Sequence, residues 1–377
     1  VNSAYHLYPT LPLKFVCPAQ PNFSHRVNPI HPDYLKKFDD VNTLSNALIS
    51  NLGDYNGSGN RIFLEIAEAA LAGVIWRTKE SYPECCNLAH VSAILMTKSF
   101  EELFDYIKAS HYASLLAKPL LDSADTDRQL AAIMTTLSNA FRKIVSPELF
   151  AIFSGHDLEL AINHPDHLCA LNIINHPKYD AALTPFLATL TKCVLMQMAE
   201  RHRHPSVFIL DEAATIKVGD LDKVLKTLRS YNIAVVLGIQ DKIDGVLMYG
   251  EQKFLSIMAN LNAKIIGKAN DPSTMKYYES LFEIIREKRT SVSRSAGLGT
   301  DTRLTTTFQD RKKHYGQEFN QLAQGQAFVF DEKGANRKVH FDLLPVIEKP
   351  LQPIYNWTPV ELKNNFDQIL ATARQLC

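Results

Sequence analysis

Two acidic residues follow a short apolar segment near the middle of the chain, and their spacing suits nucleotide chemistry. Residues 207–210 read Val-Phe-Ile-Leu and lead directly into Asp211 and Glu212. Runs this short and apolar are typical of parallel strands that are buried on both faces of a sheet. In open α/β sheets, ligands collect at the carboxyl ends of such strands. We therefore predict that Asp211 helps to hold the Mg²⁺ of a nucleoside triphosphate, as in a Walker B element, and that Glu212 polarises the attacking water.

A second apolar segment, residues 233–239, ends in Gln240 and supports this interpretation. A helical stretch over residues 221–230 separates the two segments, so the order is strand, acids, helix, strand, amide. In a nucleotide-driven motor Gln240 would sense the γ-phosphate. The alternative is a strand that simply leads into a helix, because the first turn of a helix favours acidic residues.

The phosphate-binding loop that should accompany these residues is absent from the sequence. The pattern G-x-x-x-x-G-K-[ST] occurs nowhere in the 377 residues. The glycine-rich residues 53–60 have no lysine at the required place, and residues 267–269 (Gly-Lys-Ala) lack the Ser/Thr. Because the chain begins at Val1 rather than Met, we expect a fragment whose phosphate loop lies upstream.

The composition limits the classes of protein to which the chain can belong. A chain of 377 residues that is 46% hydrophobic can bury a large core and should form more than one domain. With 40 basic and 40 acidic residues, any contact with DNA must be local. The six cysteines show no CxxC spacing, which is typical of a reducing cytoplasm. We find no apolar run of membrane-spanning length and no signal peptide, and we predict no metal beyond Mg²⁺.

Strands and helices alternate along most of the chain, but a helical block interrupts them. Strands are predicted at residues 11–17, 167–175, 207–210, 233–239 and 264–268, and a hairpin at 327–330 and 338–343. Helices are predicted at residues 41–52, 61–79, 87–96, 99–110, 125–145, 183–200, 221–230, 244–261, 271–282 and 359–375. The alternation predicts an α/β fold with a mostly parallel, doubly wound sheet. The predicted domains are the N-terminal part of a motor domain (1–40), an inserted all-helical domain (41–150), the remainder of the motor domain (151–346) and a C-terminal tail with a helix (347–377).

A polar, basic segment, residues 286–317, is expected to be mobile, and it could contact a DNA backbone in a salt-sensitive manner. The candidate residues for this contact are Arg286, Lys288, Arg289, Arg294, Arg311, Lys312 and Lys313. A solvated loop without a ligand is the favoured alternative.

Several segments, in order and spacing, resemble a known family. They are residues 24–30 (SHRVNPI), 72–76 (AGVIW), 144–149 (IVSPEL), 153–155 (FSG), 209–241 and 249–250. On these residues the chain resembles the TraG/TraD-type conjugative coupling proteins, the ATPases of type IV secretion. Its pattern is most similar to the TraG of Bacteroides-like conjugative elements. The resemblance covers roughly residues 11–345.

The resemblance implies a RecA-like P-loop NTPase core with an inserted all-helical domain, six copies of which would surround a DNA channel. It implies ATP and Mg²⁺ as cofactors, Walker B roles for Asp211 and Glu212, a sensor role for Gln240 and an arginine finger at Arg229. The implied partners are DNA, the relaxase and its relaxosome, and the secretion channel, at the cytoplasmic face of the bacterial inner membrane.

The chain departs from this family in lacking the phosphate loop and the N-terminal membrane segment, so we expect the fragment alone to be inactive. Two other functions stay open. One is a non-hydrolysing docking or assembly module of the secretion apparatus. The other is a different DNA translocase, which the helical insertion disfavours.

Overall fold

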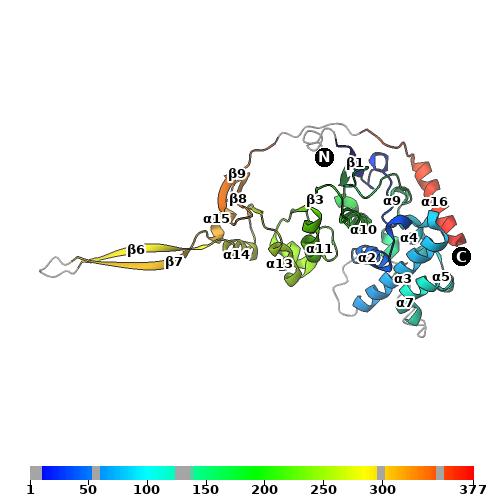
Figure 1. Cartoon of the computed structure of the whole chain (residues 1–377), viewed down its shortest axis with the longest axis horizontal. Coiled ribbons are helices and arrows are strands. Elements are labelled where there is room, and N and C mark those ends of the chain that lie inside the picture. Colours follow the sequence, from blue (N-terminus) through cyan, green and yellow to red (C-terminus); the bar gives the residue numbers. More distant parts are fainter. Residues whose placement is uncertain (1–10, 53–59, 124–136, 139, 295–301, 345–351) are drawn as a thin grey trace. The chain divides into compact units, whose positions relative to one another are not determined.

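A computed structural model describes residues 11–52, 60–123, 137–138, 140–294, 302–344 and 352–377 (Figure 1). The chain forms two compact units. The first unit contains residues 1–238 and 346–377, and the second contains residues 239–345. In sequence, the second unit is therefore inserted into the first. The predicted domain boundaries at residues 40, 150 and 346 separate a motor from a helical block, and they stay a prediction.

The first unit contains a block of helices, several of which begin at a capping side chain. They are α2 (Phe38–Ile49), α3 (Asn60–Ser81), α4 (Leu88–Thr97), α5 (Phe100–Lys108), α6 (His111–Leu116), α7 (Lys118–Asp122) and α9 (Pro147–Phe153). At α5, Ser99 and Glu102 form a reciprocal capping box, which satisfies two backbone N–H groups of the first turn. The predicted helices between residues 41 and 110 are confirmed. Most of the helix predicted at residues 125–145 lies outside the described residues.

Two small parallel sheets accompany the helical block. Strand β1 (Leu13–Val16) pairs with β2 (Ala170–Ile173), and β3 (Ser206–Leu210) pairs with β4 (Ile233–Leu237). The helices α10 (Asp180–Met198) and α11 (Leu221–Leu228) follow β2 and β3 in sequence. Short 3-10 helices connect the elements: η1 (Pro21–Phe23), η2 (Pro32–Tyr34), η3 (Pro83–Cys85), η5 (Pro177–Tyr179) and η6 (Arg229–Tyr231). The predicted α/β class is confirmed.

The prediction that β3 and β4 are buried on both faces is wrong. Val207, Ile209 and Val236 are 57%, 66% and 51% exposed, and the register places Ile209 directly opposite Val236 on one face. The alternation of exposed and half-buried positions along both strands follows from the two-residue period of a strand.

One helix is longer and more apolar than the sequence analysis expected. Residues Pro177–Met198 are long and apolar enough to cross a membrane, but 72% of the apolar window is buried inside the fold. The expectation that no apolar run reaches this length is therefore wrong. Because its apolar surface already packs against other elements, we interpret α10 as a core helix.

The segment after residue 351 returns to the first unit and binds its N-terminal part. The backbone N–H groups of Ile354 and Tyr355 donate to the carbonyl oxygen of Asn22, at 2.7 and 3.1 Å. The side chain of Asn22 bonds to both backbone groups of Trp357, accepting at 2.6 Å and donating at 3.3 Å. The amide side chain of Asn22 thus forms hydrogen bonds with a backbone segment more than three hundred residues away in the sequence.

Helix α16 (Pro359–Gln375) packs beside α4 and α9 (Figure 1). Its inward side chains Leu362, Ile369 and Ala373 are buried. The predicted helix at residues 359–375 is confirmed, and it completes the apolar core of the helical block.

The second unit has an antiparallel sheet and its own aromatic core. Its elements are α12 (Lys242–Tyr249), α13 (Glu251–Ala259), β5 (Lys264–Ile266), α14 (Pro272–Ser280), α15 (Gly316–Asn320), β8 (Gln326–Phe330) and β9 (Asn336–His340). The sheet order is β5-β8-β9, with all pairs antiparallel, so the predicted β8–β9 hairpin is confirmed. The single helix predicted at residues 244–261 is wrong. It breaks at Gly250, whose φ of +80° interrupts the helix between α12 and α13.

Two paired strands occupy much of the described part of residues 286–317, for which the sequence predicted no regular structure. Strands β6 (Ile284–Arg294) and β7 (Thr302–Lys312) form an eleven-residue antiparallel ribbon, which runs away from α14 and α15 (Figure 1). The described side chains of both strands are exposed. Because alternating apolar residues mark a strand with one buried face, these two strands give no such signal in the sequence.

Candidate functional site

Asp211 and Glu212 stand in a tight turn at the carboxyl end of β3. Asp211 is exposed and Glu212 is half-buried. Glu212 has a φ of +54°, in the left-handed region that non-glycine residues seldom adopt. Such strain costs roughly 1–3 kcal/mol and gathers at functional sites, where the surrounding structure enforces it. The backbone thus turns sharply directly after the strand and holds the two carboxylates at its end.

Gly238 holds the turn from the neighbouring strand. Its N–H donates to the carbonyl oxygen of Leu210 at 2.9 Å, and its own carbonyl accepts from the N–H of Ala213 at 2.8 Å. A Cβ placed on Gly238 would lie 2.9 Å from Oδ1 of Asp211, closer than real Cβ contacts allow. Only glycine therefore leaves the Asp211 carboxylate its present position.

The loop after the turn is fixed to two helices of the same unit. Asn51, just beyond α2, accepts from the backbone N–H of Lys217 and donates to its carbonyl, both at 2.9 Å. On α10, the Lys192 ammonium donates to the carbonyl of Gly219 at 3.1 Å, and burial lowers its pKa. The loop that carries the acids is thus anchored at two backbone points.

The turn suits a Mg²⁺ ion held through a nucleotide. Carboxylate oxygens are the ligands that this hard cation prefers, and it usually takes one or two of them together with phosphate oxygens. The Asp211 side chain is exposed, and its carboxylate lies next to Gly238, at the place where a Cβ would come too close. Among the described residues, no cluster of three or more metal-binding side chains exists, so Asp211 would contribute as a single ligand.

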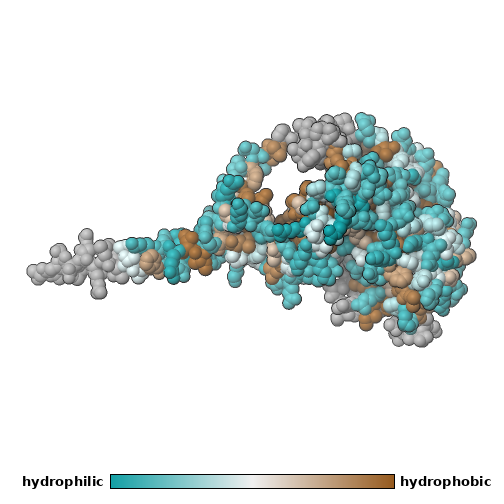
Figure 2. Space-filling view, viewed as in Figure 1, coloured by the Kyte–Doolittle hydropathy of each residue, from teal (hydrophilic) through white to brown (hydrophobic). Residues whose placement is uncertain are grey.

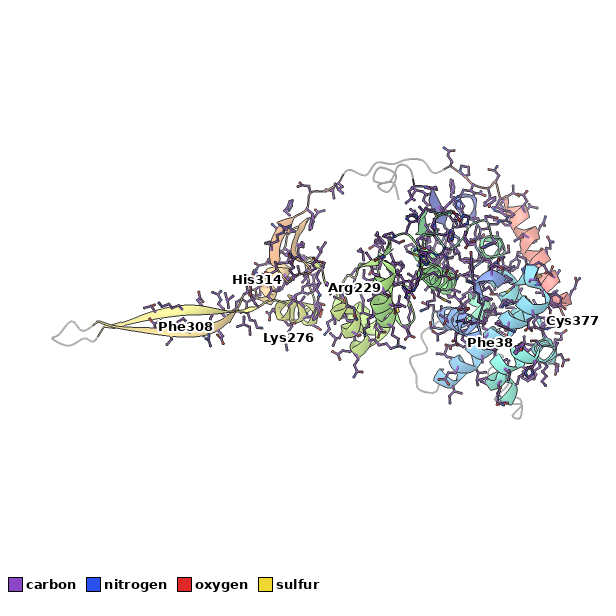
Figure 3. All side chains as sticks on the ribbon, in the orientation of Figure 1. Phe38, Arg229, Lys276, Phe308, His314 and Cys377 are labelled. Carbon is purple, nitrogen blue, oxygen red and sulfur yellow. The ribbon has the colours of Figure 1, made fainter. Side chains whose placement is uncertain are left out.

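The other two predicted catalytic residues, Arg229 and Gln240, do not belong to this turn. Arg229 follows α11 and begins η6 (Figure 3). Its side chain is exposed and forms no ion pair with a described residue. Gln240 is exposed and belongs to the second unit, two residues beyond Gly238. The structure brings together Asp211, Glu212 and Gly238.

The predicted DNA-contact residues belong to the β6–β7 ribbon or directly follow it. Arg286 pairs across the strands with Asp310 at 3.2 Å, and Arg311 pairs with Glu287 at 3.4 Å. Lys288 is exposed. The remaining candidates are placed as follows: Arg289 and Arg294 on β6, where only their backbone is described, Lys312 paired with Glu279, and Lys313 paired with Glu283 at 2.7 Å.

The sequence analysis did not identify three residues that hold the acidic turn and the loop after it. Gly238 had a usable signal, since a glycine at the end of an apolar strand often marks a close backbone approach. Asn51 had none, because its partner Lys217 lies 166 residues away. Lys192 falls within an apolar helix, where a lone lysine gives no indication of its partner.

Comparisons with known proteins give one family. A family model described as the type IV secretion-system coupling protein DNA-binding domain matches residues 33–335. No curated protein matches the chain.

Solved structures of low sequence identity show the same fold. The unbound monoclinic form of the bacterial conjugative coupling protein TrwBdeltaN70 has a TM-score of 0.69 at 16% identity, covering 88% of this chain and 74% of that one. The plasmid coupling protein TrwB in complex with ADP and Mg²⁺ has a TM-score of 0.68 at 14% identity, covering 93% and 82%. TrwB in complex with the GTP analogue GDPNP has a TM-score of 0.66 at 14% identity, covering 91% and 76%.

The chain therefore has the mixed α/β fold with a helical domain of the TrwB structures, which agrees with the RecA-like fold that the family resemblance implied. Since the family model spans well over half of the sequence, the chain belongs to the type IV secretion-system coupling proteins.

Proposed function

We propose that the chain is the cytosolic part of a conjugative coupling ATPase, which uses ATP hydrolysis to move a relaxase–DNA complex into a type IV secretion channel. The observation that carries this proposal is the strained Asp211–Glu212 turn, held by Gly238 at the carboxyl ends of two parallel strands. The solved complexes of TrwB with ADP and Mg²⁺ and with an ATP analogue support nucleotide as the ligand.

Each predicted catalytic residue has a defined role in this proposal. Asp211 binds Mg²⁺ on the nucleotide, and Glu212 orients and polarises the attacking water. Gln240 senses the γ-phosphate. Arg229, exposed at the end of α11, reaches the nucleotide of a neighbouring copy in a hexamer and stabilises charge on the transferring phosphoryl group.

The phosphate cradle is not among these residues. Backbone N–H groups and the lysine of a phosphate loop supply most contacts to the nucleotide, and no such motif occurs in residues 1–377. We therefore propose that this chain alone binds nucleotide weakly and hydrolyses none. The intact motor would act at the cytoplasmic face of the bacterial inner membrane, with the relaxosome and the secretion channel as partners.

The missing phosphate loop also favours a second candidate, a docking or assembly module that does not hydrolyse nucleotide. The variant Glu212→Gln in the intact gene distinguishes the two. If the protein is a motor, ATPase activity and DNA transfer in a mating assay are lost, while assembly is preserved. The matched control Glu101→Gln, in the first turn of α5, leaves both unchanged. Normal transfer by the Glu212→Gln variant would establish the docking module instead.

A further inference from the structure

We propose that the β6–β7 ribbon binds duplex DNA, with Arg286 and Lys288 on the phosphate backbone and Phe308 at the base edges of a groove. This inference rests on the proposed function, since it takes DNA as the ligand of the chain. It adds which element makes the contact and which form of DNA that element fits.

Charge is the first argument. The two strands carry seven basic and two acidic residues, whereas the whole chain is balanced at 40 and 40. The basic residues are Arg286, Lys288, Arg289 and Arg294 on β6 and Arg303, Arg311 and Lys312 on β7, and the acidic ones are Glu287 and Asp310. Figure 2 shows a mostly hydrophilic surface along the described part of the ribbon, with hydrophobic patches between. Such a local excess of positive charge complements a polyanion.

The dimensions of the ribbon fit a groove of the double helix. Eleven residues at about 3.3 Å each give a length of roughly 36 Å. One turn of B-DNA is about 34–36 Å long. Two strands about 4.8 Å apart, with their side chains, match a major groove about 12 Å wide, which admits a two-stranded ribbon.

One face of the ribbon combines a cation with an aromatic ring. The register places Lys288 directly opposite Phe308. Phe308 is 66% exposed, far from the aromatic core of its unit (Figure 3). Lys288 forms no ion pair with a described residue. The neighbouring pair of Arg286 with Asp310 is exposed, with side chains 76% and 65% accessible, so a phosphate can displace the carboxylate.

The content of aromatic residues favours a duplex over a single strand. Sites for single-stranded nucleic acid stack successive bases on several aromatic side chains. The two strands of the ribbon contain one aromatic residue, Phe308. A lone apolar side chain between cations is instead suited to contact base edges or to wedge at a base step in a groove.

The base of the ribbon is held by ion pairs that we assign to anchoring. Lys312 donates to Glu279, whose other oxygen accepts from the backbone N–H of Gly316 at 2.6 Å, and these bonds hold the pKa of Glu279 below its usual value. Lys313 donates to Glu283 at 2.7 Å, which lowers the pKa of that carboxyl in the same way. The outer part of the ribbon is thus presented from a fixed base.

The experiment uses the purified chain and fluorescence anisotropy. The probes are a labelled duplex of about 30 base pairs, which is about three helical turns, and the matching single strand, each titrated at several salt concentrations. The variants are Lys288→Ala, Phe308→Ala and a ribbon-less chain in which a short Gly-Ser turn replaces residues 286–310. Lys363→Ala, which changes a likewise exposed lysine on α16, is the matched control. Circular dichroism verifies that each variant folds.

The expected result is at least about tenfold preference for the duplex, which the ribbon-less chain loses. Lys288→Ala should weaken duplex binding severalfold and reduce the slope of log affinity against log salt by about 0.9, the value for one phosphate contact. Phe308→Ala should weaken binding at every salt concentration without changing that slope, and Lys363→Ala should match the parent chain.

Three results would overturn the proposal. Unchanged duplex binding by the ribbon-less chain removes the ribbon from the DNA site but leaves the proposed function intact. Ribbon-dependent binding that is equally tight for the single strand removes the duplex assignment. A dimer that forms through the ribbon, with no ribbon-dependent DNA affinity, makes the ribbon a contact between copies. The ATPase and mating tests of Glu212→Gln decide the proposed function independently of all three.

Discussion

A Cβ on Gly238 would lie 2.9 Å from Oδ1 of Asp211, so the glycine that follows β4 determines where the carboxylate that follows β3 can lie. Gly238 also holds the turn by two backbone hydrogen bonds, one to Leu210 and one from Ala213. The position of the proposed Mg²⁺ ligand, the Asp211 carboxylate, thus depends on the absence of a side chain at residue 238.

The substitution Gly238→Ala should therefore impair catalysis more than folding. Its added methyl group displaces the Asp211 carboxylate, and a misplacement of about 1 Å can lower a rate by about 100-fold. We expect ATPase activity of the intact protein to fall by about one to two orders of magnitude. Gly267→Ala is the matched control, because no atom lies within 4 Å of its added Cβ. Equal activity of the two variants would show that the Asp211 position does not matter.

Removing the amide of Asn51 should loosen the loop that follows the acidic turn. Asn51→Ala leaves both backbone groups of Lys217 without this partner and also removes a bond to the carbonyl of Ala47, and each lost hydrogen bond costs about 1 kcal/mol. We expect the free energy of unfolding in urea to fall by about 3 kcal/mol, with faster amide hydrogen exchange in residues 212–220. Asn260→Ala, which removes one local bond to Ser256, should cost about a third as much.

Two alanine substitutions on α16, one at a buried and one at an exposed residue, measure how much this helix stabilises the core of the first unit. Ile369 is 4% exposed, and a buried isoleucine cut back to alanine costs about 2–5 kcal/mol. Val360 on the same helix is 66% exposed, so Val360→Ala should change stability by no more than about 0.5 kcal/mol. Thermal and urea unfolding measure both. Similar small effects would mean that α16 does not stabilise the first unit.

The stability of the fold should depend on the protonation of His90. Burial lowers its pKa to about 4, and its Nδ1 lies 2.9 Å from Oδ1 of Asn87. Between pH 6.5 and about 4 the unfolded chain binds a proton at this residue that the folded chain does not, so stability falls as the pH falls. At about 1.4 kcal/mol per pKa unit the loss reaches about 3 kcal/mol at pH 4.

The measurement is the free energy of unfolding in urea at several pH values. His90→Gln should flatten the profile between pH 6.5 and 4, whereas His111→Gln, an exposed control on α6, should retain it. If His90→Gln and the parent chain show the same slope, His90 is not the group responsible.

Sequence reasoning located the acidic turn because its signal is local. An apolar strand that ends in two acids and a helix that begins ten residues later can be read from neighbouring residues, and β3, β4 and α11 confirm the predicted order. The α/β class followed from the same alternation. The resemblance then gave the family, which the family model confirms.

The remaining features depend on contacts that a local pattern does not contain. The strands of the ribbon are polar and their described side chains are exposed, so only the register between the strands distinguishes them from a solvated loop. The break between α12 and α13 needed the positive φ of Gly250, in a sequence that otherwise continues as a helix. The tie between Asn51 and Lys217 joins distant parts of the chain.

The insertion of the second unit into the first has a consequence for biosynthesis. A ribosome that has finished residues 1–238 has made most of the first unit, but α16 emerges only after residues 239–345. Until then the surface of α4 and α9 that α16 covers stays open to solvent. Domains generally fold as they emerge, and transiently exposed apolar surface invites aggregation. Interrupted synthesis in the second unit would thus leave a first unit with an open core, which proteases and chaperones can recognise.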